Sequence, residues 1–169
     1  NGCSCGIGTG WSSFIPNYKP EDVISATLAC ITDSPMSEIA PWYQGFKGTV
    51  SETSPGVYLT KGNFVENGCI ITITELPIGF WTDKYKSWLD ECENKHTIKK
   101  YTNNSTVDKV LFTIVKNSIT DVFDHNTLNL QTHIKTTNMT LLNECGLPIT
   151  YTSPLEIVRD FCKIRLIFY

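Results

Sequence analysis

Hydrophobic residues recur along this chain with two spacings, one typical of helices and the other of strands. Spacings of three and four residues predict three helices. The first begins at residues 20–22 and ends before 33–35, the second covers 81–92, and the third begins at 153–154, where a serine cap precedes a proline. The expected inward faces are Val23, Ile24, Leu28 and Ile31; Trp81, Tyr85, Trp88, Leu89 and Cys92; and Ile157, Phe161, Ile164 and Phe168.

Alternating apolar residues predict strands in the intervening segments. Residues 46–75 alternate and carry turn residues at 55–56 and 67–68, which predicts a three-stranded meander. Residues 107–115, and 128–142 with Ile149, predict further strands. The expected fold class is therefore α+β, with a mainly antiparallel sheet flanked by a few helices. A chain of 169 residues, 41% hydrophobic, is long enough for one domain with its own core.

Residues 6–12 (GIGTGWS) place one aliphatic side chain, Ile7, between glycines. Alternate glycines permit positive φ and close approach of the main chain to a partner, so we expect a loop rather than a regular helix or strand. An apolar residue held on such a loop can be driven between two base pairs of DNA. A tight turn with Ile7 in the core is the alternative, and the glycines alone favour it.

Five segments, in order along the chain, resemble the DNA-gate region of the type IIA DNA topoisomerases. They are residues 1–18, 41–50 (PWYQGFKGTV), 73–86 (ITELPIGFWTDKYK), 137–141 (TNMTL) and 156–169 (EIVRDFCKIRLIFY). Two departures stand out. Cys3-Ser4-Cys5 makes the first segment one residue longer than is usual, and Gly79 stands where cellular enzymes usually carry a basic residue. The second departure favours a divergent member of eukaryotic or viral origin.

The resemblance implies a piece of a larger, homodimeric enzyme that passes one DNA duplex through a transient double-strand break. It assigns residues 1–169 to a single tower (shoulder) domain, 1–16 to a DNA-contacting glycine loop and 153–169 to the start of the helix leading toward the coiled-coil gate. The family's nucleophilic tyrosine, metal-binding domain and ATPase domain lie upstream. We therefore expect no catalytic residue, metal or cofactor in this chain, and Mg²⁺ and ATP only in the intact enzyme.

The resemblance also implies that this piece grips and bends double-stranded DNA. Ile7 would intercalate from the minor groove. The other expected contacts are Gly6, Gly8 and Gly10, which let the backbone approach, and the hydroxyls of Thr9 and Ser12. Candidate basic contacts are Lys95, Lys99 and Lys100, for which a solvated face is the alternative. The net charge of −3 predicts weak DNA binding by the chain alone, because lysine and arginine dominate affinity for phosphates.

Seven cysteines leave open a rival class, a secreted disulfide-rich domain. Their number is odd and their spacing irregular, and Cys30, Cys69 and Cys162 stand among apolar neighbours. We expect free thiols in a reducing, intracellular compartment: the nucleus for a cellular enzyme, the host cytoplasm or virus factory for a viral one. Cys3 and Cys5 are too close for a usual zinc pair.

Other candidate chemistry is sparse. His96, His125 and His133 are isolated, which favours surface histidines over a metal or Ser/His/Asp site. The tyrosines are expected to lack the arginine neighbour that activates the family's nucleophile. No apolar run is long enough to span a membrane. A stand-alone, non-catalytic module that binds protein or DNA remains the second rival class.

Overall fold

The structure of the protein is a computed structural model that describes residues 2–169, apart from the side chains of residues 3–5. Two predictions fall partly outside the described residues. One is the glycine segment 1–16, which begins at Asn1. The other is the absence of zinc at the thiols of Cys3 and Cys5. None of the helices in the described chain is both long and apolar enough to cross a membrane.

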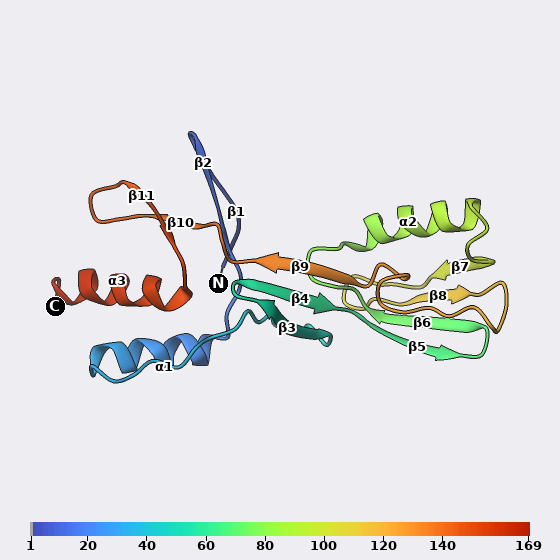
Figure 1. The fold of residues 1–169 in the computed structure, drawn as a ribbon, viewed down its shortest axis with the longest axis horizontal. Helices are drawn as coiled ribbons and strands as arrows, with labels where there is room; N and C mark the ends of the chain where they lie inside the picture. Colours follow the sequence, from blue (N-terminus) through green and yellow to red (C-terminus); the bar gives the residue numbers. More distant parts are fainter. Residues whose placement is uncertain (1) are drawn as a thin grey trace. The chain divides into compact units, whose positions relative to one another are not determined.

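The described chain folds into helices and antiparallel strands, which confirms the predicted α+β class (Figure 1). The helices are α1 (Pro20–Ile31), α2 (Thr82–Asn94) and α3 (Pro154–Leu166). The strands are β1 (Cys3–Gly8), β2 (Trp11–Ile15), β3 (Thr49–Ser54), β4 (Val57–Lys61), β5 (Asn63–Asn67), β6 (Ile70–Glu75), β7 (Lys100–Asn103), β8 (Phe112–Val115), β9 (Gln131–Lys135), β10 (Met139–Leu142) and β11 (Pro148–Tyr151).

The chain forms two compact units, each built from separate parts of the sequence. Unit 1 comprises Asn1–Gly45, Glu52–Tyr58 and Ile134–Tyr169, and unit 2 comprises Phe46–Ser51 and Leu59–His133. Length and composition predict a single domain. They carry no information on which segments pack together, so they could not predict the two units. The assignment of residues 1–169 to one tower domain stays a prediction.

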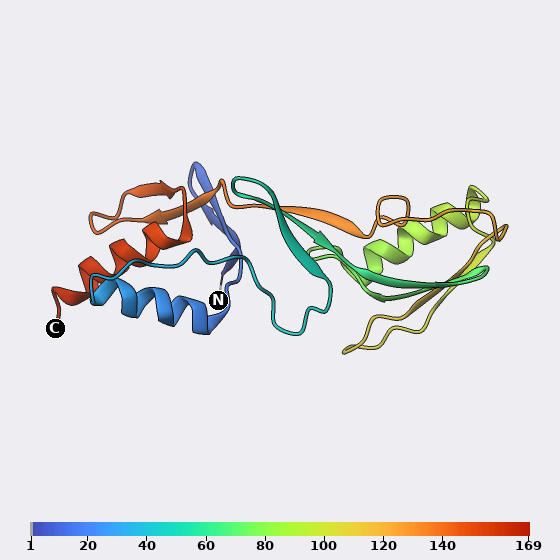
Figure 2. The ribbon, with the colours of Figure 1, turned by 60° about the horizontal axis from the view of Figure 1, so that its bottom comes forward.

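Unit 2 is an antiparallel sheet in the order β5-β6-β8-β7 with α2 packed against it (Figure 2). Tyr85 of α2 and Phe112 of β8 are fully buried, with ring centroids 5.2 Å apart. The Tyr85 hydroxyl donates a hydrogen bond of 2.8 Å to the Leu128 carbonyl oxygen. The other buried core residues are Ile71, Ile73, Leu76, Leu89, Ile98, Ile114 and Leu130. This apolar layer between helix and sheet is the larger of the two cores.

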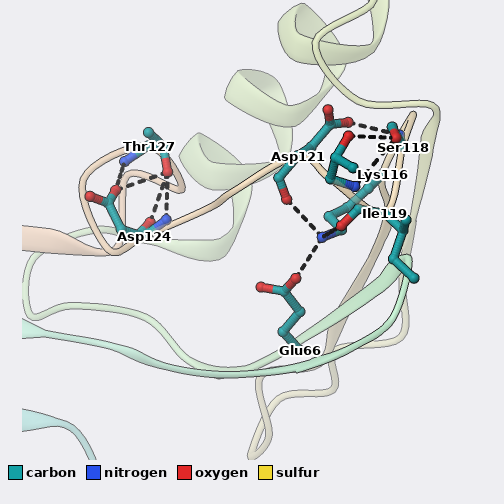
Figure 3. A network of polar contacts seen from close by, with 8 residues as sticks. Glu66, Lys116, Ser118, Ile119, Asp121, Asp124 and Thr127 are labelled. Carbon is teal, nitrogen blue, oxygen red and sulfur yellow. Dashed lines mark hydrogen bonds and ion pairs between the residues drawn. The ribbon is translucent and has the colours of Figure 1, made fainter.

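One charged side chain, Lys116, is fully buried in unit 2 (Figure 3). Its Nζ lies 2.5 Å from Glu66 Oε1 and donates to the carbonyl oxygens of Asp121 at 2.7 Å and Ile119 at 3.3 Å. Three acceptors therefore match the three donors of the ammonium group, which offsets the cost of removing the charge from water.

Unit 1 contains two hairpins, β1-β2 and β10-β11, and two helices, α1 and α3, that lie side by side (Figures 1 and 2). Ala26 of α1 and Val158 and Cys162 of α3 form the buried centre between the helices. Tyr151 of β11 donates to Asp160 Oδ2 of α3 at 3.1 Å, which ties the second hairpin to that helix.

All three predicted helices are confirmed. Ser153 Oγ accepts from the Glu156 amide at 3.3 Å, and Glu156 Oε2 accepts from the Ser153 amide at 3.4 Å, so α3 begins with a capping box. Trp81 does not join the predicted inward stripe of α2. It is the residue before the first helical turn and is 77% exposed, whereas Trp88 packs on the core.

The buried faces of α1 and α3 differ from the predicted ones. The sequence pattern selects the largest apolar residues, but Ile24 and Leu28 of α1 and Phe161 of α3 are each about three-fifths exposed. The helices meet instead through Ala26 and Cys162, because small side chains let two helices pack closely. Phe168 lies beyond the end of α3 and is also exposed.

The predicted meander over residues 46–75 is wrong in its number of strands and sheets. Four strands occupy it: β3 and β4 form a sheet in the order β3-β4-β9, and β5 and β6 join the four-stranded sheet. Buried Gly62 separates β4 from β5, and a Cβ there would lie 2.3 Å from the Glu75 carbonyl oxygen. The predicted turns at 55–56 and 67–68 are confirmed, with Gly56 and Gly68 at φ of 73° and 61°.

Two other predicted strands are shorter than the sequence pattern indicates. Only Phe112–Val115 of residues 107–115 is a strand, and Val107 is fully exposed. Residues 128–142 hold two strands of different sheets, β9 and β10. A hydrophobic pattern marks β-forming stretches but does not show where the chain changes partners.

Candidate nucleic-acid interface

The glycine segment is an antiparallel hairpin rather than the predicted loop. Strand β1 pairs with β2 in the register Gly6↔Ser13, Ile7↔Ser12 and Gly8↔Trp11. Thr9 and Gly10 form a two-residue turn, where Gly10 adopts φ of 84°. Figure 1 shows this turn at a free end of the hairpin, and both turn residues are exposed. The backbone is therefore held by cross-strand hydrogen bonds up to the residues beside the turn.

Ile7 lies on the exposed face of this hairpin. Its side chain is 82% exposed, and Ser12, which lies opposite in the register and shares its face, is exposed as well. The alternative interpretation, in which Ile7 belongs to the core, is therefore excluded. A single residue, Gly8, separates Ile7 from the turn, so Ile7 lies near the tip of the hydrogen-bonded hairpin.

The three glycines have structural roles within the hairpin. A Cβ on Gly8 would lie 2.4 Å from the indole ring of Trp11, so Gly8 leaves room for that ring. Gly10 supplies the positive φ of the turn, with nothing within 4 Å of its Cβ position. Gly6 lies opposite buried Ser13 and is half-buried. Approach of these glycines to a DNA groove stays a prediction.

Asn138 anchors the hairpin to the rest of unit 1. Its carbonyl oxygen accepts from the Phe14 amide at 2.8 Å, and its Nδ2 donates to Ser12 Oγ at 3.1 Å. The sequence pattern places Asn138 in a family-like segment but indicates no role for it. Ser12 acts as an acceptor here and keeps its hydroxyl proton to donate to a further acceptor, such as a phosphate oxygen.

Ser13 lies on the opposite face of the hairpin. It is 5% exposed, and its Oγ has no hydrogen-bond partner in the described part of the chain. An unpaired buried hydroxyl costs about 1–3 kcal/mol. The hairpin therefore carries a local penalty that its apolar and backbone contacts offset.

Tyr18, Tyr43 and Tyr58 gather in unit 1, and burial raises the pKa of each phenol. The Tyr18 hydroxyl lies 4.0 Å from Met139 Sδ, toward which it donates. Phenols with raised pKa values remain neutral at physiological pH and are poor nucleophiles. All three side chains are half-buried, so their rings pack within unit 1.

One tyrosine, Tyr169, has an arginine beside it in space, and the expectation that the tyrosines lack the arginine neighbour that activates the family's nucleophile stays a prediction. The Tyr169 hydroxyl accepts from Arg165 Nη2 at 3.1 Å, and the guanidinium lies 5.0 Å from the ring centroid. Both residues are exposed. Arg165 lies in the last turn of α3 and Tyr169 three residues beyond its end, so the contact is local in sequence and by itself indicates no catalytic centre.

The candidate basic residues belong to unit 2, whereas the hairpin belongs to unit 1. Lys95 forms an exposed ion pair with Glu91 at 3.4 Å, so part of its charge is neutralised. Lys99 and Lys100 are exposed at the start of β7. Contact of these three lysines with DNA stays a prediction.

The described residues contain no group of three or more His, Cys, Asp or Glu side chains that could hold a metal ion. His96 and His133 are exposed as expected. His125 is half-buried, with its ring centroid 5.0 Å from that of Phe64. It is therefore less exposed than the surface position that the sequence predicts.

Five cysteines are free thiols in the structure: Cys30, Cys69, Cys92, Cys145 and Cys162. This finding disfavours the rival class of a disulfide-rich domain. Cys162 is buried as predicted, whereas Cys69 is exposed despite its apolar neighbours, because it lies in the turn before β6.

Comparison with known proteins identifies relatives over the whole chain. The DNA gyrase/topoisomerase IV family model matches residues 1–169. DNA topoisomerase 2 of Plasmodium falciparum is 37% identical over 100% of this chain and 13% of its own length. DNA topoisomerase 2 of Arabidopsis thaliana is 33% identical over 97% of this chain, and that of Invertebrate iridescent virus 6 is 32% identical over 98%. The viral and Arabidopsis proteins are covered over 15% and 12% of their lengths.

A solved structure agrees with these sequence relatives. The crystal structure of the Plasmodium falciparum topoisomerase II DNA-binding, cleavage and re-ligation domain superimposes with a TM-score of 0.89 at 35% identity. The match covers 99% of this chain and 24% of that one. This chain thus spans about an eighth of the length of the Plasmodium falciparum and Arabidopsis relatives. Because the family model and these relatives cover essentially all of its residues, the chain belongs to the type II DNA topoisomerase family.

Proposed function

We propose that this chain is part of a type II DNA topoisomerase that passes one duplex through a transient double-strand break, and that the β1-β2 hairpin helps to grip and bend the broken duplex. The observation that carries this proposal is the 82% exposure of Ile7 near the tip of a hydrogen-bonded hairpin. A related solved domain bears the name DNA-binding, cleavage and re-ligation domain.

The wedge role follows from the energetics of bending. Ile7 enters the minor groove and separates two base pairs, at a cost of a few kcal/mol for unstacking. The bent duplex then contacts more protein surface, which offsets that cost. A hairpin anchored by Asn138 suits this task because its cross-strand hydrogen bonds resist displacement of Ile7.

Polar groups near Ile7 position the DNA backbone in this proposal. Thr9 is exposed in the turn, and Ser12 lies directly opposite Ile7 with a proton to donate. Gly6, Gly8 and Gly10 keep the hairpin narrow, and Lys95, Lys99 and Lys100 add charge contacts to phosphates. Contacts of this kind fix orientation without reading sequence.

The proposal assigns catalysis to other parts of the enzyme. No residue of this chain is a nucleophile, and Mg²⁺, ATP and the second copy of a homodimer act through segments outside it. In this proposal residues 1–169 form the tower region and 153–169 begin the gate helix. The enzyme acts inside the cell, in the nucleus or, for a viral member, in the host cytoplasm or virus factory.

The decisive experiment is Ile7→Ala in the full-length enzyme that contains this chain. We expect reduced bending, measured by energy transfer between labelled DNA ends, and reduced cleavage, with stability changed by only about 0.5 kcal/mol. A core isoleucine would instead lose about 2–5 kcal/mol. The matched control is Ile119→Ala, because Ile119 is 67% exposed in unit 2 and should leave bending unchanged. Normal bending by the Ile7 variant would exclude the wedge role.

Two measurements separate this proposal from the rival of a stand-alone interaction module. With net charge −3, the chain alone should bind duplex DNA at roughly 10⁻⁴ M or weaker, with a shallow salt slope, and should neither relax nor cleave plasmid DNA. Fluorescence anisotropy at two salt concentrations measures the affinity. Submicromolar binding that persists at high salt would favour the autonomous module.

A further inference from the structure

Three sulfur-bearing side chains from separate segments of unit 1 line one cavity of about 360 Å³. Cys30 comes from the last turn of α1, Met36 from the segment that follows it, and Cys162 from the middle of α3. The same three residues belong to the packed cluster between α1 and α3, where Cys162 is 4% exposed. Burial raises the pKa of the Cys162 thiol, and the neighbouring Cys30 thiol raises it further.

We propose that Cys30, Met36 and Cys162 form a binding site for a soft, thiophilic monovalent cation of the Cu(I) class. When the ion binds, both thiols release their protons to water and become thiolates. Two thiolates and a thioether are the ligands that Cu(I) prefers, whereas hard cations require oxygen ligands. A structural zinc site takes four ligands, usually of Cys and His, and the described residues supply no group of that kind here.

The charges around the cavity suit such an ion. Cu(I) bound by two thiolates carries a net charge of −1. Arg159 and Lys163 line the same cavity and offset that charge, while Asp33 also lines it and carries the opposite sign. Lys163 is itself paired with Asp160 at 3.7 Å, so Arg159 is the principal counter-charge.

The site joins the two helices of unit 1. Cys30 and Cys162 lie on α1 and α3, so one bound ion cross-links them through coordinate bonds. A ligand that binds only the folded state stabilises that state, and the stabilisation grows with the logarithm of the ratio of ligand concentration to dissociation constant. Cu(I) binding should therefore raise the melting temperature of the chain.

The test is an anaerobic Cu(I) titration against a chromophoric Cu(I) chelator, using the full chain with Cys3→Ser and Cys5→Ser so that this adjacent pair cannot compete. We expect one equivalent of Cu(I) and an X-ray absorption spectrum with a sulfur-only shell of three atoms. Cys30→Ser and Cys162→Ser should each weaken Cu(I) binding by more than about 100-fold. Mutation of residues that only hydrogen-bond to metal ligands already lowers metal affinity by about 10–100-fold. Met36→Leu should weaken it less and leave two sulfur ligands.

Matched controls are Cys69→Ser and Cys145→Ser, which remove exposed thiols and should leave the affinity unchanged. Thermal melting without metal checks that each variant folds. Because Cys162 is buried, Cys30→Ser and Met36→Leu carry the test if Cys162→Ser unfolds. The proposal is overturned by absence of Cu(I) binding, by equal binding in Cys30→Ser, or by tighter stoichiometric binding of Zn²⁺ than of Cu(I).

Discussion

The two compact units bury their large apolar side chains to different extents. Unit 2 encloses Tyr85 and Phe112 completely between α2 and its sheet. Unit 1 packs α1 on α3 through Ala26 and Cys162 and leaves Phe161 60% exposed. Unit 2 is therefore stabilised mainly by its enclosed apolar core. Unit 1 is stabilised by close contact between two helices and by hydrogen bonds, and large apolar side chains of both helices remain exposed.

One buried polar side chain in each unit shows a contrast in hydrogen bonding. Lys116 of unit 2 has three acceptors, while Ser13 of unit 1 has none in the described chain. The free-energy penalty for a buried group without hydrogen bonds is far larger for a charge than for a hydroxyl. Complete pairing is therefore expected for the Lys116 ammonium group, whereas a single unpaired hydroxyl is tolerated.

The largest effect should come from paired truncations of phenylalanine. Phe112→Ala in unit 2 should lower the free energy of unfolding by about 3–5 kcal/mol, because it empties a fully enclosed site. Phe161→Ala in unit 1 should change it by no more than about 0.5 kcal/mol. Urea denaturation of both variants measures the difference. Similar losses would show that Phe161 is covered in solution.

Removal of the buried lysine should have the next largest effect. Lys116→Ala leaves Glu66 and two carbonyl oxygens without their donor, and breaking a buried pair costs about 3–5 kcal/mol. We expect the lower end of that range because Glu66 is 37% exposed, so water screens it. The control is Lys95→Ala, whose exposed pair should be worth less than about 1 kcal/mol. Chemical denaturation tests both, and a loss under about 1 kcal/mol for Lys116→Ala would contradict this account.

The smallest effect should have the opposite sign. Ser13→Ala removes an unpaired buried hydroxyl and should raise the free energy of unfolding by about 1 kcal/mol. Ser12→Ala is the matched control on the exposed face, although it removes the acceptor of the Asn138 bond and should be slightly destabilising. Differential scanning calorimetry compares the two. Destabilisation by Ser13→Ala would mean that its hydroxyl finds a partner, such as water, in solution.

Local signals in the sequence were sufficient for the helices and several turns. The proline and acids at 20–22 and the Ser153 capping box act within one helical turn, so neighbouring residues alone establish them. The candidate interface was harder to predict. The glycines identified a special backbone at Ile7, but the hairpin depends on pairing with β2, and the role of Asn138 depends on a contact across 126 residues of sequence.

The sequence by itself determined the family, the α+β class and the places where helices begin and the chain turns, because motifs, caps and positive-φ glycines are local. Only the tertiary structure decided the division into two units, the inward faces of α1 and α3, and the exposure of Ile7 and Trp81. The physical reason is that burial is a property of partners. Burial of a hydrophobic side chain lowers the free energy of the folded state, whichever surface covers it. Periodicity in the sequence does not show which surface that is.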